Sequence, residues 1–529
     1  MPSAQEFAAL HKALAEATRR SEALFGELRI VRTERDLLQE QLNKFKRQLF
    51  AAKSEVLGAN QKDMFFNEAE ELGADAQPAV EDSDQKTVDV PGHKRAVRGR
   101  KPLDPALPRE VVRHELPESE RVCPHDGAAL REIGVEASEQ MDIIPQQVRV
   151  IRHERVKYAC PCCDAGLRLA AKPPQVIPKG LFTEGLLAWV ITSKYMDGLP
   201  LYRQAALLGR FGGADISRNT MAASVVRVGH AVQPVINLLR DRLLEAPLIY
   251  GDETEIQVLK EPGRKAQTKS YMWAQMTEKS GAEGTGPPIR LFAYTPSRST
   301  QASLGLYAGA RAGGVLMTDG YEPYNKVAEV NRLVHLACWA HCRRYFNDAV
   351  QALPKDKRGP EQLAAQFMDL IAQLYHVESV ARQEGLDANA LTLRRRERSL
   401  PVLDKIKALV LANLHAVAPA SLLGKALHYA QGQWTKLERY VDDGRHPIDN
   451  NACENSIRPF VIGRRNWLFA DTVAGANASA NLYSLLQTCK ANGIDGYAYL
   501  RKLLIELPKA STADDYEALL PWSIGIDPT

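Results

Sequence analysis

The sequence lacks any segment that would send the chain out of the cell or hold it in a membrane. Its first residues, MPSAQEFAAL, contain no basic stretch followed by an apolar one. No apolar run approaches the roughly 18 residues that a membrane-spanning helix requires. We therefore expect an unexported, soluble protein of the cytoplasm that has no membrane partner.

Cysteine is scarce, and its distribution does not suit a disulfide framework. The chain has 8 cysteines, and Cys160, Cys162 and Cys163 are nearly adjacent. Disulfide frameworks spread their cysteines along the chain, whereas clustered cysteines in a reducing compartment are typical of metal binding. The pattern favours a cytoplasmic metal site.

The sequence also lacks a strong excess of either charge. Its net charge is only +4, with 25% charged and 45% hydrophobic residues, which is an ordinary globular composition. The net charge alone does not indicate what kind of partner the protein binds. A chain of 529 residues is long enough for roughly three or four domains of about 150 residues.

A regular apolar repeat runs through residues 1–60 and predicts a coiled coil. An unbroken 4-3 alternation passes through Leu10, Leu14, Ala17, Ser21, Leu24, Leu28, Val31, Arg35, Leu38, Leu42, Phe45 and Leu49. Such a repeat favours a homo-oligomer, and Arg35 at a core position would weaken the seam while fixing its register. Alternatively, this segment is a long amphipathic helix that packs against its own chain.

Residues 61–108 have few large apolar side chains and predict a flexible linker. The linker contains the basic sequence RGRKP, in which Arg98, Arg100 and Lys101 could lie in a narrow, A·T-rich minor groove of DNA. The alternative is a basic linker that is simply solvated.

Two cysteine knuckles about 35 residues apart predict a zinc-ribbon-like module over residues 109–178. Cys160 and Cys163 form a complete knuckle. The other knuckle pairs Cys123 with Asp126 where a second cysteine is expected, so either Asp126 or His125 would be the fourth zinc ligand. Alternatively, the metal has been lost and the ribbon packs without it.

Residues 179–245 show a helical pattern that resembles a helix-turn-helix. One helix is expected over PLYRQAALLGRFG, and a second helix, RNTMAASVVRVG, would be capped by Ser217. Arg218 and Asn219 would then lie at the exposed start of a DNA-recognition helix. A helical pair of this kind is equally common in packed bundles.

Residues 246–349 predict three consecutive strands, a helix, and two further strands. In the first strand, period two places Asp252 on the same face as Tyr250 and Ile256, and burying a carboxylate there is costly unless a positive charge meets it. Asp319 ends the fourth strand in an Asp-Gly pair, which taken alone is typical of a turn.

Helical, charge-rich sequence over residues 350–443 interrupts this pattern, and Glu454 follows in a helix within residues 444–485. Glu454 is in phase with Ile457 and Val461. Two structural explanations compete with a catalytic one. Asn451 and Glu454 fit a capping box, and Glu454 with Arg458 fits an i, i+4 ion pair.

This order of elements is typical of a multidomain α/β protein with a ribonuclease H-like core and a helical insertion. In that fold, acids on the first and fourth strands and on a late helix meet at the carboxyl edge of the sheet. Three such acids can hold two Mg²⁺ ions about 3.5–4 Å apart for phosphoryl transfer. Residues 486–529 would add a C-terminal helical element.

Several long motifs resemble the insertion-sequence 66 family of DDE transposases over almost the whole chain. They are LYRQAALLGRFG, GDET, MTDGYEPYN, ACWAHCRRYF, IDNNACENSIRPFVIGRRNWLF and SLLQTCKANGIDGYAYL, in this order. The resemblance implies that Asp252, Asp319 and Glu454 are metal-binding catalytic residues. It also implies a structural role near the site for Cys338 and His341, which match a Cys-x-x-His signature of such transposases. Asp126 departs from the family pattern and puts the zinc content in doubt.

The resemblance further implies a reaction and a set of partners. Magnesium-dependent hydrolysis at the terminal inverted repeats would free a 3′ hydroxyl that attacks target DNA, with accessory proteins of the same element as further partners. In the bacterial cytoplasm, the protein would associate with the nucleoid when it is bound to DNA. Candidate phosphate contacts are Arg458, Arg464 and Arg465.

Three more residues near Glu454 have expected roles. Asn450 and Asn451 would orient the start of the helix or the acid, and Trp467 would either stack on a displaced base or pack in the core. Two other functions fit the same residues: a structure-selective nuclease that lacks strand joining, and an inert coiled-coil DNA-binding regulator.

Overall fold

The computed structural model describes residues 147–158, 168–212, 216–278, 286–354 and 357–526, strands β1 (Thr87–Val90) and β2 (His93–Ala96), and some positions between 16 and 42. The chain divides into two compact units, residues 77–149 and the remainder. In the smaller unit, β1 and β2 pair antiparallel within the predicted linker. The candidate ribbon ligands Cys123, His125, Asp126, Cys160 and Cys163, and the basic residues Arg98, Arg100 and Lys101, lie outside the described residues.

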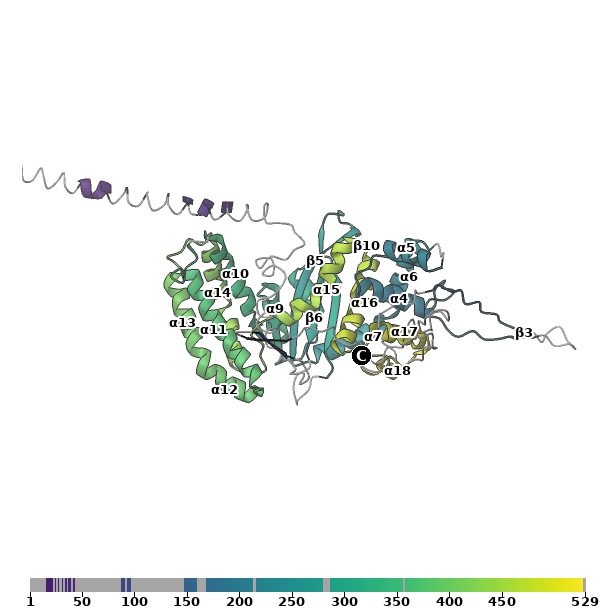
Figure 1. Ribbon diagram of the computed structural model, residues 1–529. Coiled ribbons are helices and arrows are strands. Elements are labelled where there is room, and N and C mark those ends of the chain that lie inside the picture. The colour runs from purple at the N-terminus through teal and green to yellow at the C-terminus, as the bar shows by residue number, and fades with distance from the viewer. Residues whose placement is uncertain are drawn as a thin grey trace, which may run out of the picture. The chain divides into compact units, whose positions relative to one another are not determined.

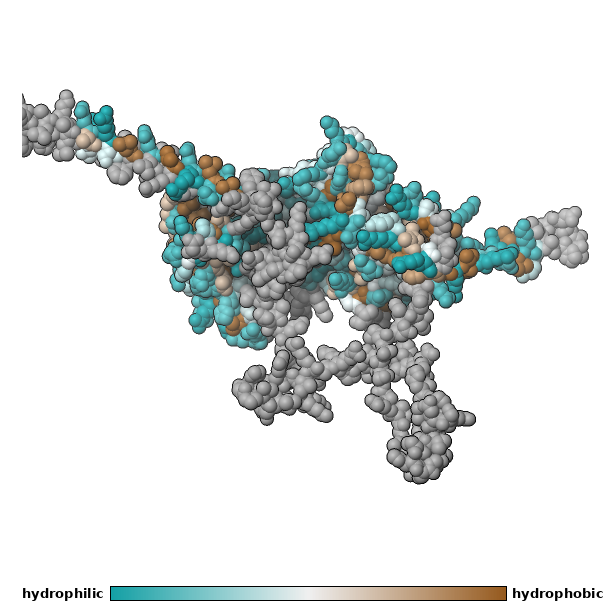
Figure 2. All heavy atoms as spheres, turned by 45° about the horizontal axis from the view of Figure 1, so that its top comes forward, coloured by the Kyte–Doolittle hydropathy of each residue, from teal (hydrophilic) through white to brown (hydrophobic). Residues whose placement is uncertain are grey.

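The described positions of the N-terminal segment are helical, as the apolar repeat predicts. Residues 16–21 form helix, and Leu24, Val31, Leu38 and Leu42 lie on helical turns further along. Between 46% and 64% of the surface of these four side chains is exposed, and Figure 2 shows brown, apolar residues at intervals along this segment. An exposed apolar seam of this kind is available to a second chain.

The centre of the larger unit is a mixed sheet (Figure 1), and its strand order is β7-β6-β5-β8-β9. Strands β5 (Leu248–Lys260), β6 (Lys269–Thr277) and β7 (Ile289–Thr295) form an antiparallel meander. Strands β8 (Val315–Thr318) and β9 (Val334–Ala337) add in parallel beside β5. These strands occupy the segments that alternation and apolar runs predict. Strand β10 (Ala470–Thr472) pairs in parallel with the far end of β5.

Strand β5 changes its environment along its length. Towards its end, buried Ile256 and Val258 alternate with exposed Glu255, as period two predicts, but its first half is buried on both faces. Gly251 lies in this first half, and a Cβ atom there would meet the Tyr307 hydroxyl at 2.1 Å. Glycine is therefore required immediately before Asp252.

Helix α16 (Val473–Ala491) covers the sheet edge formed by β7. The Ser484 hydroxyl accepts a hydrogen bond of 2.8 Å from the backbone amide of Phe292, and the Thr488 hydroxyl accepts one of 3.0 Å from Arg290. These bonds satisfy edge amides that would otherwise be open to pairing with another strand. The buried small and hydroxyl residues of α16 thus allow a close approach that larger side chains would prevent.

Helix α16 also attaches the predicted helix-turn-helix region to the sheet. That region contains α4 (Glu184–Tyr195), α5 (Leu201–Gly212), α6 (Arg218–Ala231) and α7 (Gln233–Leu244). A Cβ atom on Gly229 of α6 would lie only 2.4 Å from that of Ala478, and the Asn481 amide donates to the Gly229 carbonyl at 2.8 Å. The C-terminal element consists of α17 (Gly496–Glu506), η4 (Leu507–Lys509) and α18 (Ala513–Glu517).

The predicted helical interruption, residues 350–443, belongs to a helical bundle with its own core, and this bundle begins earlier than predicted, at Trp339. Its helices are α10 (Trp339–Ala352), α11 (Leu363–Gln383), α12 (Ala388–Arg398), α13 (Leu400–Asn413), α14 (Leu422–Glu438) and the short η3 (Arg439–Val441). Phe346 and Phe367 stack with ring centroids 4.3 Å apart inside this core. Among the described residues, no helix is long and apolar enough to cross a bilayer.

A buried arginine connects this bundle to the loop that leads back to the sheet. The Arg395 guanidinium is 2% exposed and binds both carboxylate oxygens of Glu378, at 2.8 and 2.7 Å. It also donates to the carbonyl oxygens of Tyr440, Asp443 and His446. Because one side chain binds a buried acid and three carbonyls, its removal would leave Glu378 and the carbonyls of Tyr440 and His446 without this donor, while the Asp443 carbonyl would keep its bond from the His446 amide.

We predict that Arg395→Met lowers the free energy of unfolding by about 3–5 kcal/mol, since it leaves Glu378 as a buried, unpaired charge. Arg394→Met is the matched control, because Arg394 is one position away and pairs with Glu384 at the surface. The control should cost about 1 kcal/mol or less. Denaturant unfolding measures both changes, and equal losses in the two variants would contradict the buried network.

Candidate functional site

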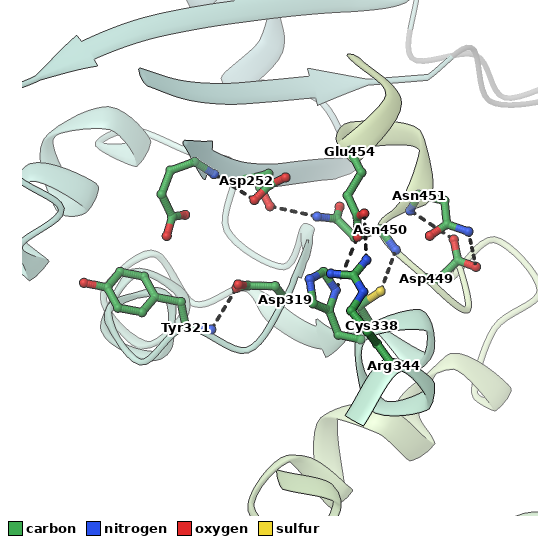
Figure 3. Close-up of polar contacts among 12 residues, drawn as sticks. Asp252, Asp319, Tyr321, Cys338, Arg344, Asp449, Asn450, Asn451 and Glu454 are labelled. Atoms are coloured by element: carbon green, nitrogen blue, oxygen red, sulfur yellow. Dashed lines mark hydrogen bonds and ion pairs between the residues drawn. The ribbon is translucent and has the colours of Figure 1, made fainter. Parts of the chain in front are cut away.

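Strand register brings Asp252 and Asp319 side by side at one edge of the sheet. Tyr250 of β5 pairs with Met317 of β8 in parallel. Asp252 lies two residues after Tyr250, and Asp319 lies two residues after Met317. Residues two apart on a strand point to the same face, so the two carboxylates extend in the same direction. Glu454 reaches them from the first turn of α15 (Asn451–Trp467). Figure 3 shows the three acids coming from three different elements.

The three acids interact electrostatically. The pKa of Asp252 is raised well above its usual value, first by burial and then by the charges of Asp319, Glu253 and Glu454. Its carboxylate oxygen accepts a hydrogen bond of 2.8 Å from the Glu253 amide, which only partly offsets the repulsion. Carboxylate oxygens that repel one another in a partly dry site form a donor set that suits a divalent cation such as Mg²⁺.

The side chain of Glu454 points towards α10. Arg344 donates to one carboxylate oxygen at 3.1 Å, and the Nδ1 atom of His341 lies 3.4 Å from the other. Burial lowers the pKa of His341, so its imidazole is largely neutral at pH 7. The capping-box explanation of Glu454 is wrong, because the N-cap residue is Asn450, which makes no side-chain cap bond. Asn451 instead bonds to Asp449.

Asn450 fixes the start of α15 against β5. It is fully buried, and its amide group donates to the Gly251 carbonyl at 3.0 Å, directly before Asp252. Its backbone amide donates to the sulfur of Cys338 at 3.2 Å, where β9 leads into α10. The structure thus places Asn450 and Cys338 in contact, between the strand that carries Asp252 and the helix that carries Glu454.

Asp319 is both a turn residue and a member of the acidic cluster. Its carboxylate accepts a hydrogen bond of 2.9 Å from the Tyr321 amide, and Gly320 beside it has a positive φ of 99°. The helical bundle supports this turn from the other side, since Tyr429 donates to the Asp319 carbonyl and Gln433 to that of Gly320. The interpretation of Asp319 as a turn residue is therefore compatible with its interpretation as a functional residue.

Three polar residues at the site were not singled out from the sequence. Glu253 has a side chain that is 6% exposed, accepts a hydrogen bond from Tyr324, and has its pKa raised to about 7 by burial and by Asp319. Burial raises the pKa of Asp449 to about 6. Arg344 lies three residues after His341, and this spacing places both residues on the same face of the helix. The spacing could have identified Arg344 from the sequence.

The predicted basic residues of α15 lie beyond Glu454 along the helix. Arg465 is exposed, Arg458 and Arg464 are half-buried, and Arg464 reaches Thr254 of β5 at 3.4 Å. Trp467 is half-buried at the end of the helix, where the Lys194 ammonium lies 3.7 Å from the centre of its ring. This contact favours packing over base stacking for Trp467, and burial lowers the pKa of Lys194 to about 7.

Arg218 and Asn219 are the first residues of α6, and both are exposed. The Ser217 hydroxyl accepts a hydrogen bond of 3.1 Å from the Thr220 amide, so the structure has the predicted N-cap. The cap leaves the two side chains at the helix start turned to solvent. Whether they bind DNA stays a prediction.

The sheet, the acidic cluster and the helical bundle all lie within one family match. A model described as "Transposase IS66 family" matches residues 179–478, which is more than half of the chain. The chain belongs to the IS66 transposase family. Three further IS66 models match: a zinc-finger binding domain at residues 120–164, a C-terminal element at 484–522, and "Transposase C of IS166 homeodomain" at 37–112.

Curated relatives of this IS66-family chain occur in Sinorhizobium fredii, where they carry the description "uncharacterized protein". The protein y4qI is 35% identical over 82% of this chain and 79% of its own length. The protein y4jD is 32% identical over 92% of this chain and 94% of its own length. The family relationship therefore extends over nearly the whole chain.

We predict that Asp252→Asn makes the metal-free protein more stable at pH 7. Because the pKa of Asp252 is raised in the folded state, its contribution to the free energy of unfolding falls as the pH rises from the unfolded pKa of about 3.9. The midpoint of thermal unfolding in EDTA should exceed that of the wild type at pH 7, and the difference should shrink below about pH 4.

Glu255→Gln is the control for this comparison. Glu255 lies on the same strand, but it is half exposed and paired with Lys269 at the surface. This substitution should leave the midpoint nearly unchanged. If the wild type and Asp252→Asn unfold at the same temperature at pH 7, repulsion at Asp252 does not destabilise the fold.

Proposed function

We propose that the protein is a DDE transposase that cleaves DNA at the terminal inverted repeats of an insertion sequence and joins the freed ends to target DNA. The observation that carries this proposal is the convergence of Asp252, Asp319 and Glu454 from β5, the end of β8 and α15. Family membership supports the same activity. The three acids come from distant parts of the sequence and repel one another. Their close placement therefore has no evident structural purpose.

The sheet topology supports a ribonuclease H-like core. An antiparallel meander of three strands, followed by two strands in parallel beside the first, gives the order β7-β6-β5-β8-β9. This is the arrangement in which acids of the first and fourth strands meet at one edge. The helical bundle would then be an insertion between the second and third acids of the core.

Asp252, Asp319 and Glu454 would hold two Mg²⁺ ions, since their oxygen donors match the preference of that ion. When bound, such ions stabilise the attacking and leaving oxygens of an in-line phosphoryl displacement. In cleavage, water replaces the 3′ oxygen at phosphorus and frees a 3′ hydroxyl. In joining, that hydroxyl replaces a 3′ oxygen of the target strand, so no covalent protein intermediate is needed.

The basic residues of α15 would position the DNA. Arg458, Arg464 and Arg465 follow Glu454 along the same helix, and phosphate contacts of this kind orient a duplex without reading its sequence. Arg344 is half exposed beside Glu454 and would meet the phosphate at the cut. At the start of α6, Arg218 and Asn219 would contact DNA as part of a helix-turn-helix.

The N-terminal part would contribute DNA binding and assembly. The homeodomain-type match supports DNA contacts by Arg98, Arg100 and Lys101, and the zinc-finger match supports zinc held by Cys123, Asp126, Cys160 and Cys163. Residues 10–49 would join copies of the chain through their apolar seam. Sedimentation of a chain without these residues tests the assembly, and an unchanged mass would contradict it.

We predict that the protein cuts and joins DNA carrying the ends of its element when Mg²⁺ is present. Glu454→Gln keeps the shape of the side chain but removes its charge, and it should reduce both products by at least about 10²-fold. Glu255→Gln, on the outer part of β5, should retain activity because Glu255 faces solvent. Separation of the DNA products on a denaturing gel measures both steps.

Each result of this assay has a distinct meaning. Joined products that disappear in Glu454→Gln support the transposase. Cutting without joining, with the companion proteins of the same element added, would instead identify a structure-selective nuclease. Sequence-specific binding without cutting under those same conditions would identify an inert regulator.

A further inference from the structure

A second group of metal-ligating atoms lies beside the acidic pair. Among the described residues, Cys338, His341 and Glu454 each offer one ligand atom, and these atoms lie within 4.8 Å of one another. Figure 3 shows Cys338 and Glu454 of this group. The Nδ1 atom of His341 and a carboxylate oxygen of Glu454 are 3.4 Å apart. Tetrahedral zinc sites, with bonds of about 2.0–2.3 Å, separate their ligand atoms by roughly 3.3–3.8 Å. The separation between His341 and Glu454 matches such a site, whereas the 4.8 Å limit for the whole group is about 1 Å wider, so the ligands would close slightly around an ion.

The hydrogen bonding of the cluster also indicates a missing partner. Among the residues that the structure describes, neither the buried Nδ1 atom of His341 nor the buried, facing oxygen of Glu454 has a hydrogen-bond partner, and the two atoms contact each other only at ion-pair distance. Buried polar atoms are nearly always satisfied, so two such atoms that face each other indicate a ligand between them. The second oxygen of Glu454 is bound by Arg344, which leaves the first oxygen directed at the cluster.

Burial, followed by the charges of Asp449 and Glu454, raises the pKa of the Cys338 thiol well above its usual value, so a bound cation is what would make its thiolate favourable. Cys338 is fully buried at the N-terminus of α10, where the helix dipole favours a negative charge. The Asn450 backbone amide donates to its sulfur at 3.2 Å. Hydrogen bonds of this kind orient metal ligands from behind and tune their affinity.

We propose that Cys338, His341 and Glu454 bind one thiophilic divalent cation of the Zn²⁺ class, with water as the fourth ligand. Sulfur and imidazole ligands favour such an ion over Mg²⁺, which prefers a site built from oxygen. Binding transfers the Cys338 thiol proton to solvent, because the thiolate is the ligand.

The site would inhibit the magnesium-dependent reaction, and this part rests on the proposed function. Glu454 belongs to both ligand sets, so a bound thiophilic ion withdraws it from Asp252 and Asp319. The guanidinium of Arg344 binds the other oxygen of Glu454 at 3.1 Å, and its side chain is 52% exposed, so it can turn to solvent when the ion binds. The two ions therefore compete for one carboxylate.

The first test measures zinc bound by the full-length chain after dialysis against a buffered Zn²⁺ solution. The wild type should hold one more equivalent than Cys338→Ser, whereas Cys342→Ala should match the wild type. Cys342 is an equally buried thiol four residues away and outside the cluster, and the cysteines of the zinc-finger region contribute the same background to all three proteins. Equal zinc content in the wild type and Cys338→Ser would overturn the proposal.

A spectroscopic measurement and a second variant distinguish the loss of a metal ligand from the loss of the folded structure. Cobalt(II) in place of zinc should give a thiolate charge-transfer band that is weaker in Cys338→Ser than in Cys342→Ala. If Cys338→Ser unfolds at a lower temperature than the wild type, His341→Gln replaces it, because His341 is partly exposed and its loss removes a ligand without opening the core. An unchanged cobalt spectrum in a folded ligand variant would also overturn the site.

The second test measures magnesium-dependent cleavage as Zn²⁺ is increased, with each variant compared with its own zinc-free rate. The wild type and Cys342→Ala should lose activity at a zinc concentration about tenfold or more below that needed for Cys338→Ser. Equal zinc sensitivity in all three would contradict the shared role of Glu454. If the transposase proposal itself fails, no protein cleaves DNA, but the difference in zinc content remains.

Discussion

Repulsion among carboxylates that share one partly dry site is the constraint on which the rest of this structure depends. The register between β5 and β8 places Asp252 and Asp319 next to each other, and Glu454 approaches from α15. Burial first, and then the charges of the neighbouring carboxylates, raise the pKa of Asp252, so the cost of this arrangement combines desolvation with repulsion. A site with such a cost persists only when the surrounding elements hold it in place, and it becomes favourable when a cation binds.

The contacts that hold the site come from parts of the chain far apart in sequence. Asn450 bonds to the carbonyl before Asp252, and the Cys338 sulfur bonds to Asn450, so α15 and α10 are both fixed to the sheet. Tyr429 of the helical bundle holds the turn at Asp319. Through Arg395, the same bundle also fixes the loop that leads into α15. The bundle is therefore a direct support of the site.

Local patterns allowed much of the fold to be predicted from the sequence, whereas Asp319 and Glu454 were assigned to the site through the family resemblance. Period-two alternation located β5 and Asp252, apolar runs located the later strands, and the Ser217 cap located the start of α6. These signals depend on neighbours within a few residues of one another. The convergence of the acids was expected from the order of the strands, which fixes where the strand ends meet.

Interactions between distant residues could not be predicted in this way. The contact of Glu454 with Arg344 and His341 joins residues more than 100 positions apart, and local spacing instead suggested a capping box that the structure does not contain. The sequence predicted only a helical, charge-rich segment around Arg395, although this residue is among the most buried side chains of the bundle. Its environment depends on how α11, α12 and the following loop pack together.

The most direct test of the central claim is a change of metal preference in the cleavage reaction. In Asp252→Cys, sulfur replaces a carboxylate ligand, and sulfur binds Mg²⁺ poorly but accepts softer ions such as Mn²⁺. If Asp252 holds the catalytic metal, this variant should be inactive with Mg²⁺ and recover part of its cleavage activity with Mn²⁺. If Mg²⁺ supports the variant as well as the wild type, Asp252 is not a metal ligand in the reaction and the account is wrong.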